Sequence, residues 1–422
     1  MYTYIYINFF EKKYILLLMI KICIIGLGYV GLPICLMSSS KFQTVGFDTN
    51  STRIKNLKNK FDQNNEYKKK DFINKKILFT DKILDIKNCN FYIICVPTPV
   101  NQKNQPNLVP IKNSFNTISK VLKVNDIIIL ESTVYPGVTN KFTKILEKKN
   151  KLIHNKDFFI GYSPERINPG DKENSLENIN KIIALNTTNK IVNNKVRSIY
   201  KNFCKKLIFT KYIKEAETAK AIENIQRDLN IAFFNEILMI SDRLKLNFSE
   251  VIRLAKTKWN FMNFNPGLVG GHCLPVDPYY LSYIAQQNNF KSIVALAGRK
   301  TNNNMEEFII EKFNQHIKFQ NKKLKNLRVL VVGLTYKYGV SDMRNSLNYK
   351  IYNKIKGIVK KAYAYDPFCV ENNFVLTKNS SNLFNFDVIL FLSKGSLFQK
   401  LYRKIKIKKP QVIFDPFYYY TD

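Results

Sequence analysis

Short runs of apolar residues alternate with longer amphipathic stretches over the first half of the chain. The apolar runs include ICIIG at 22–26, TVGFD at 44–48, FYIICV at 91–96, DIIIL at 126–130 and DFFIGY at 157–162. Runs of this length are typical of buried strands, and the stretches between them have the length and spacing of helices. The alternation predicts βαβ units built around a parallel sheet.

The middle of the chain is predicted to form one long helix. Residues 214–245 contain no Pro or Gly, and apolar residues recur there at a helical period. A second series of strand-length runs follows, with RVLVVG at 328–333, AYAYD at 362–366, DVILFL at 387–392 and QVIFD at 411–415. The predicted fold is α/β, with two Rossmann-like doubly wound domains joined by a long central helix.

Length and composition favour several packed cores. The chain has 422 residues, of which 45% are hydrophobic and 23% charged, so disorder is excluded as its overall state. Lys and Arg number 67 against 32 Asp and Glu, which gives a net charge of +35. Because these residues are spread along the chain and accompany abundant Asn, Ile, Tyr and Phe, we attribute them to the codon usage of an AT-rich genome. We therefore expect neither a nucleic acid nor a membrane partner.

The Cys content and the N-terminal sequence both indicate the cellular compartment of the protein. Seven Cys occur without a C-x-x-C pair, which favours free thiols in a reducing compartment over a disulfide framework. The apolar run at 14–25 follows Lys12 and Lys13 and so imitates a signal peptide, but Lys21 interrupts it and no small-residue cleavage site follows. We expect a cytoplasmic protein in which residues 1–18 are an extension and Met19 is the functional start.

A glycine motif lies between the first predicted strand and the helix after it. Gly26, Gly28 and Gly31, with Tyr29 and Val30 between them, allow a tight turn and a close approach of the backbone to a pyrophosphate. Asp48 ends the next strand, where a carboxylate binds a ribose 2′-hydroxyl and repels a 2′-phosphate. The motif predicts NAD rather than NADP as cofactor. If Asp48 is misplaced, Arg53 is the residue available to a 2′-phosphate; a glycine turn without a cofactor is the other alternative.

A single Cys lies in the glycine- and proline-rich loop GGHCLPVDP at 270–278. Gly270 and its neighbour leave room for a substrate beside the Cys273 thiol, and Asp277 follows four residues later. We interpret Cys273 as a nucleophile, with a buried structural Cys as the alternative. His272 is one of three His in the chain, without a spacing suited to zinc. We expect it to be structural or to orient its neighbours, and we predict no metal site.

Other candidates lie on the long helix and at strand ends. Lys220 and Asn224 are four residues apart and so share one helix face, where an ammonium and an amide can stabilise an oxyanion; a solvated face is the equal alternative. Four more candidates follow strands, where open α/β sheets bind ligands, although each also suits an ordinary turn: Thr98, Thr133, Glu165 and Arg166.

These motifs together resemble the UDP-glucose/GDP-mannose dehydrogenase family from Met19 to the end of the chain. The similar segments are GLGYVGLP, VPTP, ESTVYPG, YSPERINPGD, EAETAKAIEN, GLVGGHCLPVDPYYL and GLTYKYGVSDMRNS. NQPNLVPI, TKWNF and PGLVGGHC are similar to the branch that oxidises UDP-N-acetylhexosamines for capsule and O-antigen synthesis. The resemblance implies oxidation of C6 of UDP-GlcNAc or UDP-GalNAc to the carboxylate, with two NAD reduced in succession and a thioester on Cys273.

The resemblance also implies roles for the remaining residues. Lys220 and Asn224 stabilise oxyanions, and Asp277 or Glu165, with Thr133 positioning water, serves proton transfer and hydrolysis. Lys337, Asp342 and Arg344 lie on the nucleotide side, and Arg299 contributes to the substrate pocket. The implied domains are an NAD-binding domain at 19–208, a central helical domain at 209–317 that builds a homodimer or larger homo-oligomer, and a UDP-sugar-binding domain at 318–422.

Three alternatives stay open at this stage. The first is UDP-glucose 6-dehydrogenase activity, and the second is a nucleotide-sugar-binding protein that has lost catalysis. Retention of Cys273, Lys220, Asn224 and Asp277 together argues against such a loss. The third is a basic nucleic-acid binder on an α/β scaffold, but the chain contains no aromatic-basic RNA or DNA module.

Overall fold

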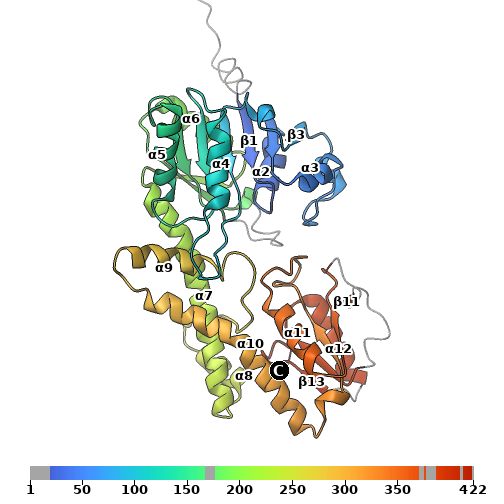
Figure 1. The fold of residues 1–422 in the computed structure, drawn as a ribbon. Helices are drawn as coiled ribbons and strands as arrows, with labels where there is room; N and C mark the ends of the chain where they lie inside the picture. Colours follow the sequence, from blue (N-terminus) through green and yellow to red (C-terminus); the bar gives the residue numbers. More distant parts are fainter. Residues whose placement is uncertain (1–19, 167–175, 370–374, 377–385, 409–411, 421–422) are drawn as a thin grey trace, which may run out of the picture. The chain divides into compact units, whose positions relative to one another are not determined.

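A computed structural model describes residues 20–166, 176–369, 375–376, 386–408 and 412–420 (Figure 1). The proposed extension at 1–18 and the proposed start at Met19 lie outside these residues. The chain divides into two compact units, Met1–Ile222 and Glu223–Asp422. One long helix, α7 (Ile213–Arg243), crosses the boundary between them. The predicted α/β fold class with a long central helix is confirmed; the three domain boundaries given above stay a prediction.

The first unit is built on an eight-stranded sheet with the order β3-β2-β1-β4-β5-β6-β7-β8. Its strands are β1 (Lys21–Ile25), β2 (Gln43–Phe47), β3 (Ile77–Thr80), β4 (Phe91–Ile94), β5 (Ile127–Leu130), β6 (Phe159–Tyr162), β7 (Asn180–Leu185) and β8 (Lys206–Thr210). All neighbours pair in parallel except β6 and β7, which are antiparallel. Strands β1, β4 and β5 are almost wholly buried, which explains their continuous apolar sequences.

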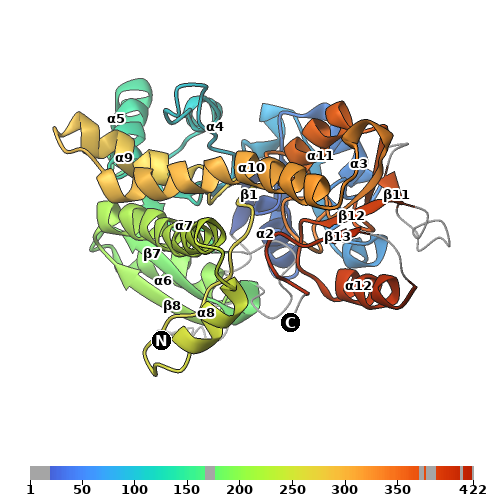
Figure 2. The same cartoon turned by 90° about the horizontal axis from the view of Figure 1, so that it is seen from below.

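Helices cover both faces of this sheet (Figure 2). Buried side chains of α2 (Gly31–Ser38), α3 (Ser51–Lys58) and α6 (Lys190–Tyr200) form one apolar cluster with the strands. Those of α4 (Val109–Ser119) and α5 (Val138–Asn150) form the cluster on the opposite face. Short 3₁₀ turns occupy Lys69–Phe72, Ile83–Ile86 and Leu176–Asn178. The arrangement leaves the carboxyl ends of the strands for a ligand.

The second unit combines helices with a five-stranded parallel sheet of order β11-β10-β9-β12-β13. After α7 come α8 (Phe248–Ala255), α9 (Asp277–Gln287) and α10 (Ile293–Phe319), and a 3₁₀ turn at Leu324–Asn326. The sheet contains β9 (Arg328–Val332), β10 (Lys361–Tyr365), β11 (Val375–Leu376), β12 (Val388–Phe391) and β13 (Val412–Phe414), with α11 (Leu347–Ile358) and α12 (Ser396–Lys408) against it.

Helices α7 and α10 run side by side (Figure 2). A Cβ added to Gly298 on α10 would lie 2.5 Å from Leu229 Cδ2 on α7, so the glycine allows the two helices to pack closely without moving that side chain. The contact fixes the helix that carries two of the predicted catalytic residues.

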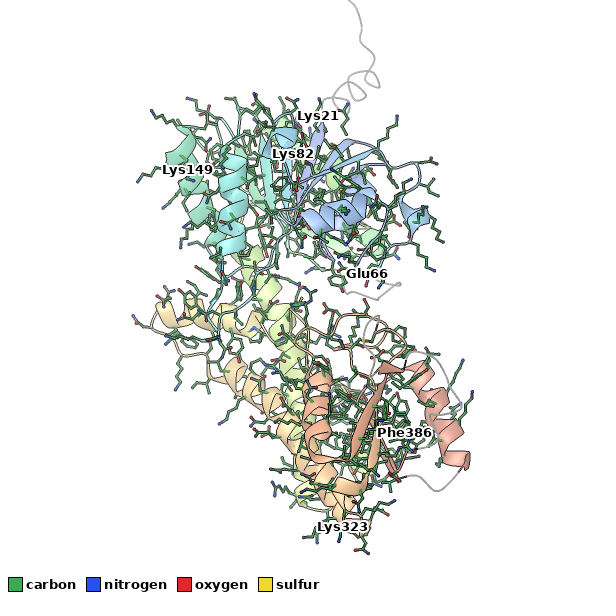
Figure 3. All side chains as sticks on the ribbon, turned by 45° about the vertical axis from the view of Figure 1, so that its right-hand side comes forward. Lys21, Glu66, Lys82, Lys149, Lys323 and Phe386 are labelled. Carbon is green, nitrogen blue, oxygen red and sulfur yellow. The ribbon has the colours of Figure 1, made fainter. Side chains whose placement is uncertain are left out.

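Lysines account for much of the basic charge. Figure 3 shows Lys82, Lys149 and Lys323 projecting from different parts of the chain, and all three are exposed. Their dispersal fits the interpretation of the charge excess as a background feature.

Candidate active site

The glycine turn after β1 is shaped by close backbone contacts. Gly26 has a φ of +91°, and a Cβ there would lie 2.8 Å from the Cys95 carbonyl oxygen. A Cβ on Gly31, the first residue of α2, would lie 1.8 Å from the Gly26 carbonyl oxygen. A Cβ on Gly28 would instead meet no protein atom within 4 Å. The outer glycines therefore build the turn, and Gly28 leaves space open in front of the helix N-terminus where a pyrophosphate binds.

Asp48 lies directly after β2 and is tied to this turn. The Leu27 amide donates to Asp48 Oδ2 (2.9 Å), and the Asn50 amide donates to Asp48 Oδ1 (2.9 Å). Each carboxylate oxygen retains further acceptor capacity, as a ribose diol requires. The residues present therefore fit NAD.

Arg53 stabilises the glycine turn through a hydrogen bond to its backbone. Its Nε donates to the Leu27 carbonyl (2.9 Å), and its guanidinium forms a buried ion pair with Asp62 (2.7 Å). Because Arg53 is only 6% exposed, the structure gives it a role in holding the glycine turn. It does not present Arg53 as an exposed phosphate ligand.

The predicted strand-end residues of the first unit follow β4, β5 and β6. Thr98 and Thr133 are both half-buried, and Arg166 donates to the Asn180 carbonyl (3.4 Å). Ser132, beside Thr133, donates to the Val96 carbonyl (2.7 Å) and so joins two of these segments. Thr98 and Thr133 thus follow the carboxyl ends of the central strands β4 and β5, as the glycine turn follows that of β1.

Glu165 belongs to a buried ionic cluster that the sequence analysis did not anticipate. Lys181 Nζ lies 2.6 Å from Glu131 Oε2 and 3.2 Å from Glu165 Oε2. The Tyr200 hydroxyl donates to Glu131 Oε1 (2.6 Å). A lone Lys within the apolar run KIIAL was the signal available, because a charged residue in a buried strand requires partners.

Glu217 anchors the start of α7. Its carboxylate accepts hydrogen bonds from the Gly137 amide (2.6 Å) and from the amide and hydroxyl of Thr139 (2.9 and 2.7 Å). These donors belong to the first turn of α5, so Glu217 caps that helix. Burial raises the pKa of Glu217, and the hydrogen bonds from Thr139 and Gly137 oppose that rise. Lys220, which is 8% exposed, follows one turn later on α7.

The side chains of Asn224 and Asp277 are hydrogen-bonded to each other in the second unit. The Asn224 amide donates to Asp277 Oδ2, and Asp277 is 2% exposed at the first position of α9. The Asp277 amide in turn donates to the Cys273 carbonyl (2.9 Å), while the Cys273 side chain is exposed. These hydrogen bonds connect the loop that carries Cys273 to the start of α9, and the start of α9 to α7.

Glycines shape the loop that carries Cys273. Gly271 has a φ of +88°, and a Cβ there would lie 2.7 Å from the Tyr336 ring. A Cβ on Gly270 would lie 2.8 Å from the Asn345 carbonyl oxygen. The loop therefore packs closely on the segment after β9, which includes the predicted nucleotide-side residues.

Asp342 is the centre of that segment. Arg344 donates to both of its carboxylate oxygens, at 2.7 Å in the shortest contact, and His272 Nε2 lies 3.3 Å from Oδ2. Burial alone would raise the pKa of Asp342, but the hydrogen bonds from His272 and Arg344 lower it below its usual range. Half-buried Lys337 lies on the same segment. His272 thus acts as an orienting partner of Asp342.

Arg299 is buried between two helices of the second unit. It is 1% exposed, and its guanidinium pairs with Asp228 on α7 and donates to Asn303 (3.1 Å). Asn302 donates to the same Asp228 carboxylate (2.7 Å). Arg299 therefore joins α10 to α7, and its contribution to the substrate pocket stays a prediction. Sequence alone could not show this, because an Arg on an amphipathic helix normally faces solvent.

Within the described ranges, no group of His, Cys, Asp or Glu side chains is arranged to hold a metal ion. None of the helices described is long and apolar enough to cross a membrane.

Comparison with known proteins identifies the family. Residues 20–204 match the NAD-binding domain of the UDP-glucose/GDP-mannose dehydrogenase family, residues 214–304 its central domain and residues 330–422 its UDP-binding domain. The chain belongs to this family. It is an NAD-dependent nucleotide-sugar dehydrogenase, which oxidises a UDP-sugar at C6.

Individual members of the family are similar to this chain over most of its length. The chain is 43% identical to UDP-N-acetyl-D-glucosamine 6-dehydrogenase of Salmonella typhi, over 83% of this chain and 82% of that protein. It is 41% identical to Protein CapL of Staphylococcus aureus, over 86% of this chain and 84% of that protein. Among solved structures, the UDP-D-ManNAc dehydrogenase of Pyrococcus horikoshii matches with a TM-score of 0.82 and 29% identity, covering 95% of this chain and all of that one.

Proposed function

We propose that this enzyme oxidises C6 of a UDP-N-acetylhexosamine, UDP-GlcNAc or UDP-GalNAc, to the uronic acid through a thioester on Cys273. The observation that carries the proposal is the exposed Cys273 side chain in a loop whose backbone is hydrogen-bonded to Asp277, the residue that also accepts a hydrogen bond from Asn224. A thiol so placed is a nucleophile for an aldehyde, and it keeps that aldehyde from escaping. The identity to UDP-N-acetyl-D-glucosamine 6-dehydrogenases supports the choice of sugar.

The reaction balances with two hydride acceptors. The glycine turn and Asp48 would hold NAD, which would supply the hydride acceptor that each of the two oxidations needs. The C6 alcohol first loses a hydride and a proton to give the aldehyde. The Cys273 thiolate adds to that carbon, and the resulting thiohemiacetal loses a second hydride to give the thioester. Water then attacks the thioester carbon and gives its two protons to general bases and solvent, the C–S bond breaks, and the carboxylate and free thiolate are released.

The chain's own residues supply the other roles in this proposal. Lys220 and Asn224, one helical turn apart on α7, stabilise the oxyanions. Asp277 and Glu165 are the acids available for proton transfer and hydrolysis, with Thr133 positioning water. Lys337 and Arg344 bind the UDP side, and Arg166 and Gly270 contribute to the sugar pocket.

The proposal extends to assembly and to cellular role. On α7, exposed Ile222, Phe233 and Ile240 are separated by 11 and 7 residues and so form one stripe, an apolar face suited to a second copy. We infer a homodimer through this stripe. We also infer a cytoplasmic location, because NAD and UDP-sugars are found there, and a role in surface polysaccharide synthesis.

The test is NADH formation with UDP-GlcNAc, UDP-GalNAc and UDP-glucose in parallel. The proposal expects the highest kcat/KM with one of the two acetamido sugars. A clear preference for UDP-glucose would instead establish the runner-up, UDP-glucose 6-dehydrogenase. Binding of all three without NADH formation would indicate a homologue that has lost catalysis.

A further inference from the structure

Strand β9 ends in a glycine turn that is held by a carboxylate from the neighbouring strand. The Gly333 amide donates to the Tyr365 carbonyl (2.9 Å), and the Leu334 amide donates to Asp366 Oδ2 (2.8 Å). The other oxygen, Asp366 Oδ1, accepts from the Phe368 amide (3.0 Å). Asp366 directly follows β10 and is fully buried, so these bonds fix the backbone of the turn inside the second unit.

The glycine turn of the first unit has the same bonds. The Gly26 amide donates to the Phe47 carbonyl (2.9 Å), and the Leu27 amide donates to Asp48 Oδ2 (2.9 Å). The first glycines of the two turns also have similar φ angles, +91° and +88°. Asp366 therefore has the same place relative to its turn in the second unit as Asp48 has in the first.

The two turns differ at their third residue, which is Gly28 in the first and Thr335 in the second. A Cβ on Gly28 would meet no protein atom within 4 Å, so the first turn leaves space for a ligand. Thr335 is 1% exposed, and its amide donates to Asp366 Oδ2 (3.0 Å). Its hydroxyl lies 3.0 Å from that same oxygen and 3.0 Å from the Lys337 carbonyl. The acceptor capacity of Asp366 Oδ2 is thus used by the chain itself.

Three further side chains fill the space around the second turn. Asn348 Nδ2 donates to the Gly333 carbonyl (3.2 Å) and to Ser393 Oγ (2.8 Å). The Ser346 hydroxyl donates to the Leu334 carbonyl (2.6 Å). All three of these side chains are buried. Protein side chains therefore occupy the place that the first turn leaves open.

We propose that Asp366 is a positioning residue for UDP, which binds no ribose itself and acts through Thr335 on the backbone at Lys337. The proposal rests on the proposed function, in which Lys337 binds the UDP side, and deepens it. The Thr335 hydroxyl takes the acceptor oxygen that a ribose hydroxyl would need. The second turn is therefore closed to the ribose contact that is expected of Asp48 with NAD, and it shapes the segment after it instead.

Two other roles for Asp366 would give different results. If its carboxylate bound the ribose of UDP, replacing it would reduce affinity for UDP more than for the deoxy analogue that lacks the bound hydroxyl. If it only stabilised the sheet, replacing it would lower Tm and leave the UDP affinity of the folded chain unchanged. A positioning role lowers affinity for UDP, 2′-deoxy-UDP and 3′-deoxy-UDP by one common factor, because the lost contact is not with the ribose.

The decisive variants are Asp366→Asn, Thr335→Ala and Thr335→Ser, each in the full chain, with binding of UDP and its two deoxy analogues measured by calorimetry. Asp366→Asn places an amide donor against backbone N–H groups, so all three nucleotides should bind roughly tenfold to a hundredfold more weakly. NAD affinity should not change, because the first turn is intact. Thr335→Ala should weaken UDP binding roughly threefold to tenfold, and Thr335→Ser, which keeps the hydroxyl, should bind UDP like wild type.

The matched control is Asp387→Asn, because Asp387 accepts the Arg328 amide (2.7 Å) at the opposite end of β9. It should leave UDP affinity unchanged. Wild-type UDP affinity in folded Asp366→Asn would overturn the proposal, and so would a larger loss for UDP than for either deoxy analogue. If Asp366→Asn does not fold, equal UDP affinities in Thr335→Ala and Thr335→Ser overturn it.

Failure of the proposed function is distinguishable from failure of this inference, because UDP binding requires no turnover. If wild type binds UDP but oxidises no UDP-sugar, the proposed function fails, and the affinities of the Asp366 and Thr335 variants still test the inference. If wild type oxidises a UDP-sugar and Lys337→Met binds UDP as tightly as wild type, the reaction stands. Asp366 then has no UDP ligand to position, and the inference is overturned.

Discussion

The hydrogen bonds of Glu217 are predicted to hold the start of α7 against α5, and replacing Glu217 by Ala tests this most directly. Glu217→Ala removes the acceptor for the amides of Gly137 and Thr139 and for the Thr139 hydroxyl. Each buried donor left without an acceptor costs about 1–3 kcal/mol, so a loss of about 3 kcal/mol for the set is expected. For a unit of this size, that corresponds to a decrease in Tm of roughly 6–12 °C.

The assay is thermal unfolding of the full chain, combined with amide hydrogen exchange at Gly137 and Thr139. Exchange should accelerate at both amides in the variant, because they lose their acceptor. Since Lys220 follows Glu217 by one turn on the same helix, kcat should also fall. Glu215→Gln is the matched control, because Glu215 is exposed in the same first turn and should leave Tm within about 1 °C. If Glu217→Ala and this control unfold at the same temperature, the capping argument is refuted.

Three further predictions concern the cofactor and the buried acid. Gly28→Ala should fold like wild type, because its Cβ meets no protein atom within 4 Å, yet lose NAD affinity in calorimetry; Gly31→Ala should be destabilised, since its Cβ would lie 1.8 Å from a carbonyl oxygen. Asp48 should give a kcat/KM strongly in favour of NAD over NADP, and equal values would show that it does not face the 2′-position. Glu131 has a higher pKa in the folded chain than unfolded, so its stabilising effect is complete at acidic pH and is lost as pH rises through about 7. Wild type should therefore lose stability between about pH 4.5 and 7 relative to Glu131→Gln, and parallel Tm curves would contradict this assignment.

Much of the fold could be predicted because the buried parallel strands have continuous apolar sequences. The runs at 22–26, 44–48 and 91–96 correspond to β1, β2 and β4, and the Gly- and Pro-free stretch corresponds to α7. Strand β7 was not among the predicted strands because its first two residues are polar, which leaves an apolar run of only IIAL, and the partners of Lys181, Glu131 and Glu165, are distant in sequence. The pattern of neighbouring residues along the chain does not reveal pairs between distant residues.

Within the candidate site, too, local sequence patterns predicted some features and could not predict others. The glycine turn and Asp48 could be predicted because their spacing is local and their backbone requirements are strict. The pairing of Arg299 with Asp228 could not be predicted, because Asp228 lies on another helix and only the packed structure shows the guanidinium buried. Residues whose role depends on burial require the fold to be known first.

The measurement that tests the central claim most directly is product analysis with Cys273→Ala. Wild type should form two NADH for each uronic acid released, and its intact mass should show a transient acyl adduct. Cys273→Ala should bind the UDP-sugar yet form no carboxylate, whereas the control Cys204→Ala, which removes a half-buried thiol, should behave like wild type. Acid formation at the wild-type rate by Cys273→Ala would contradict the thioester mechanism.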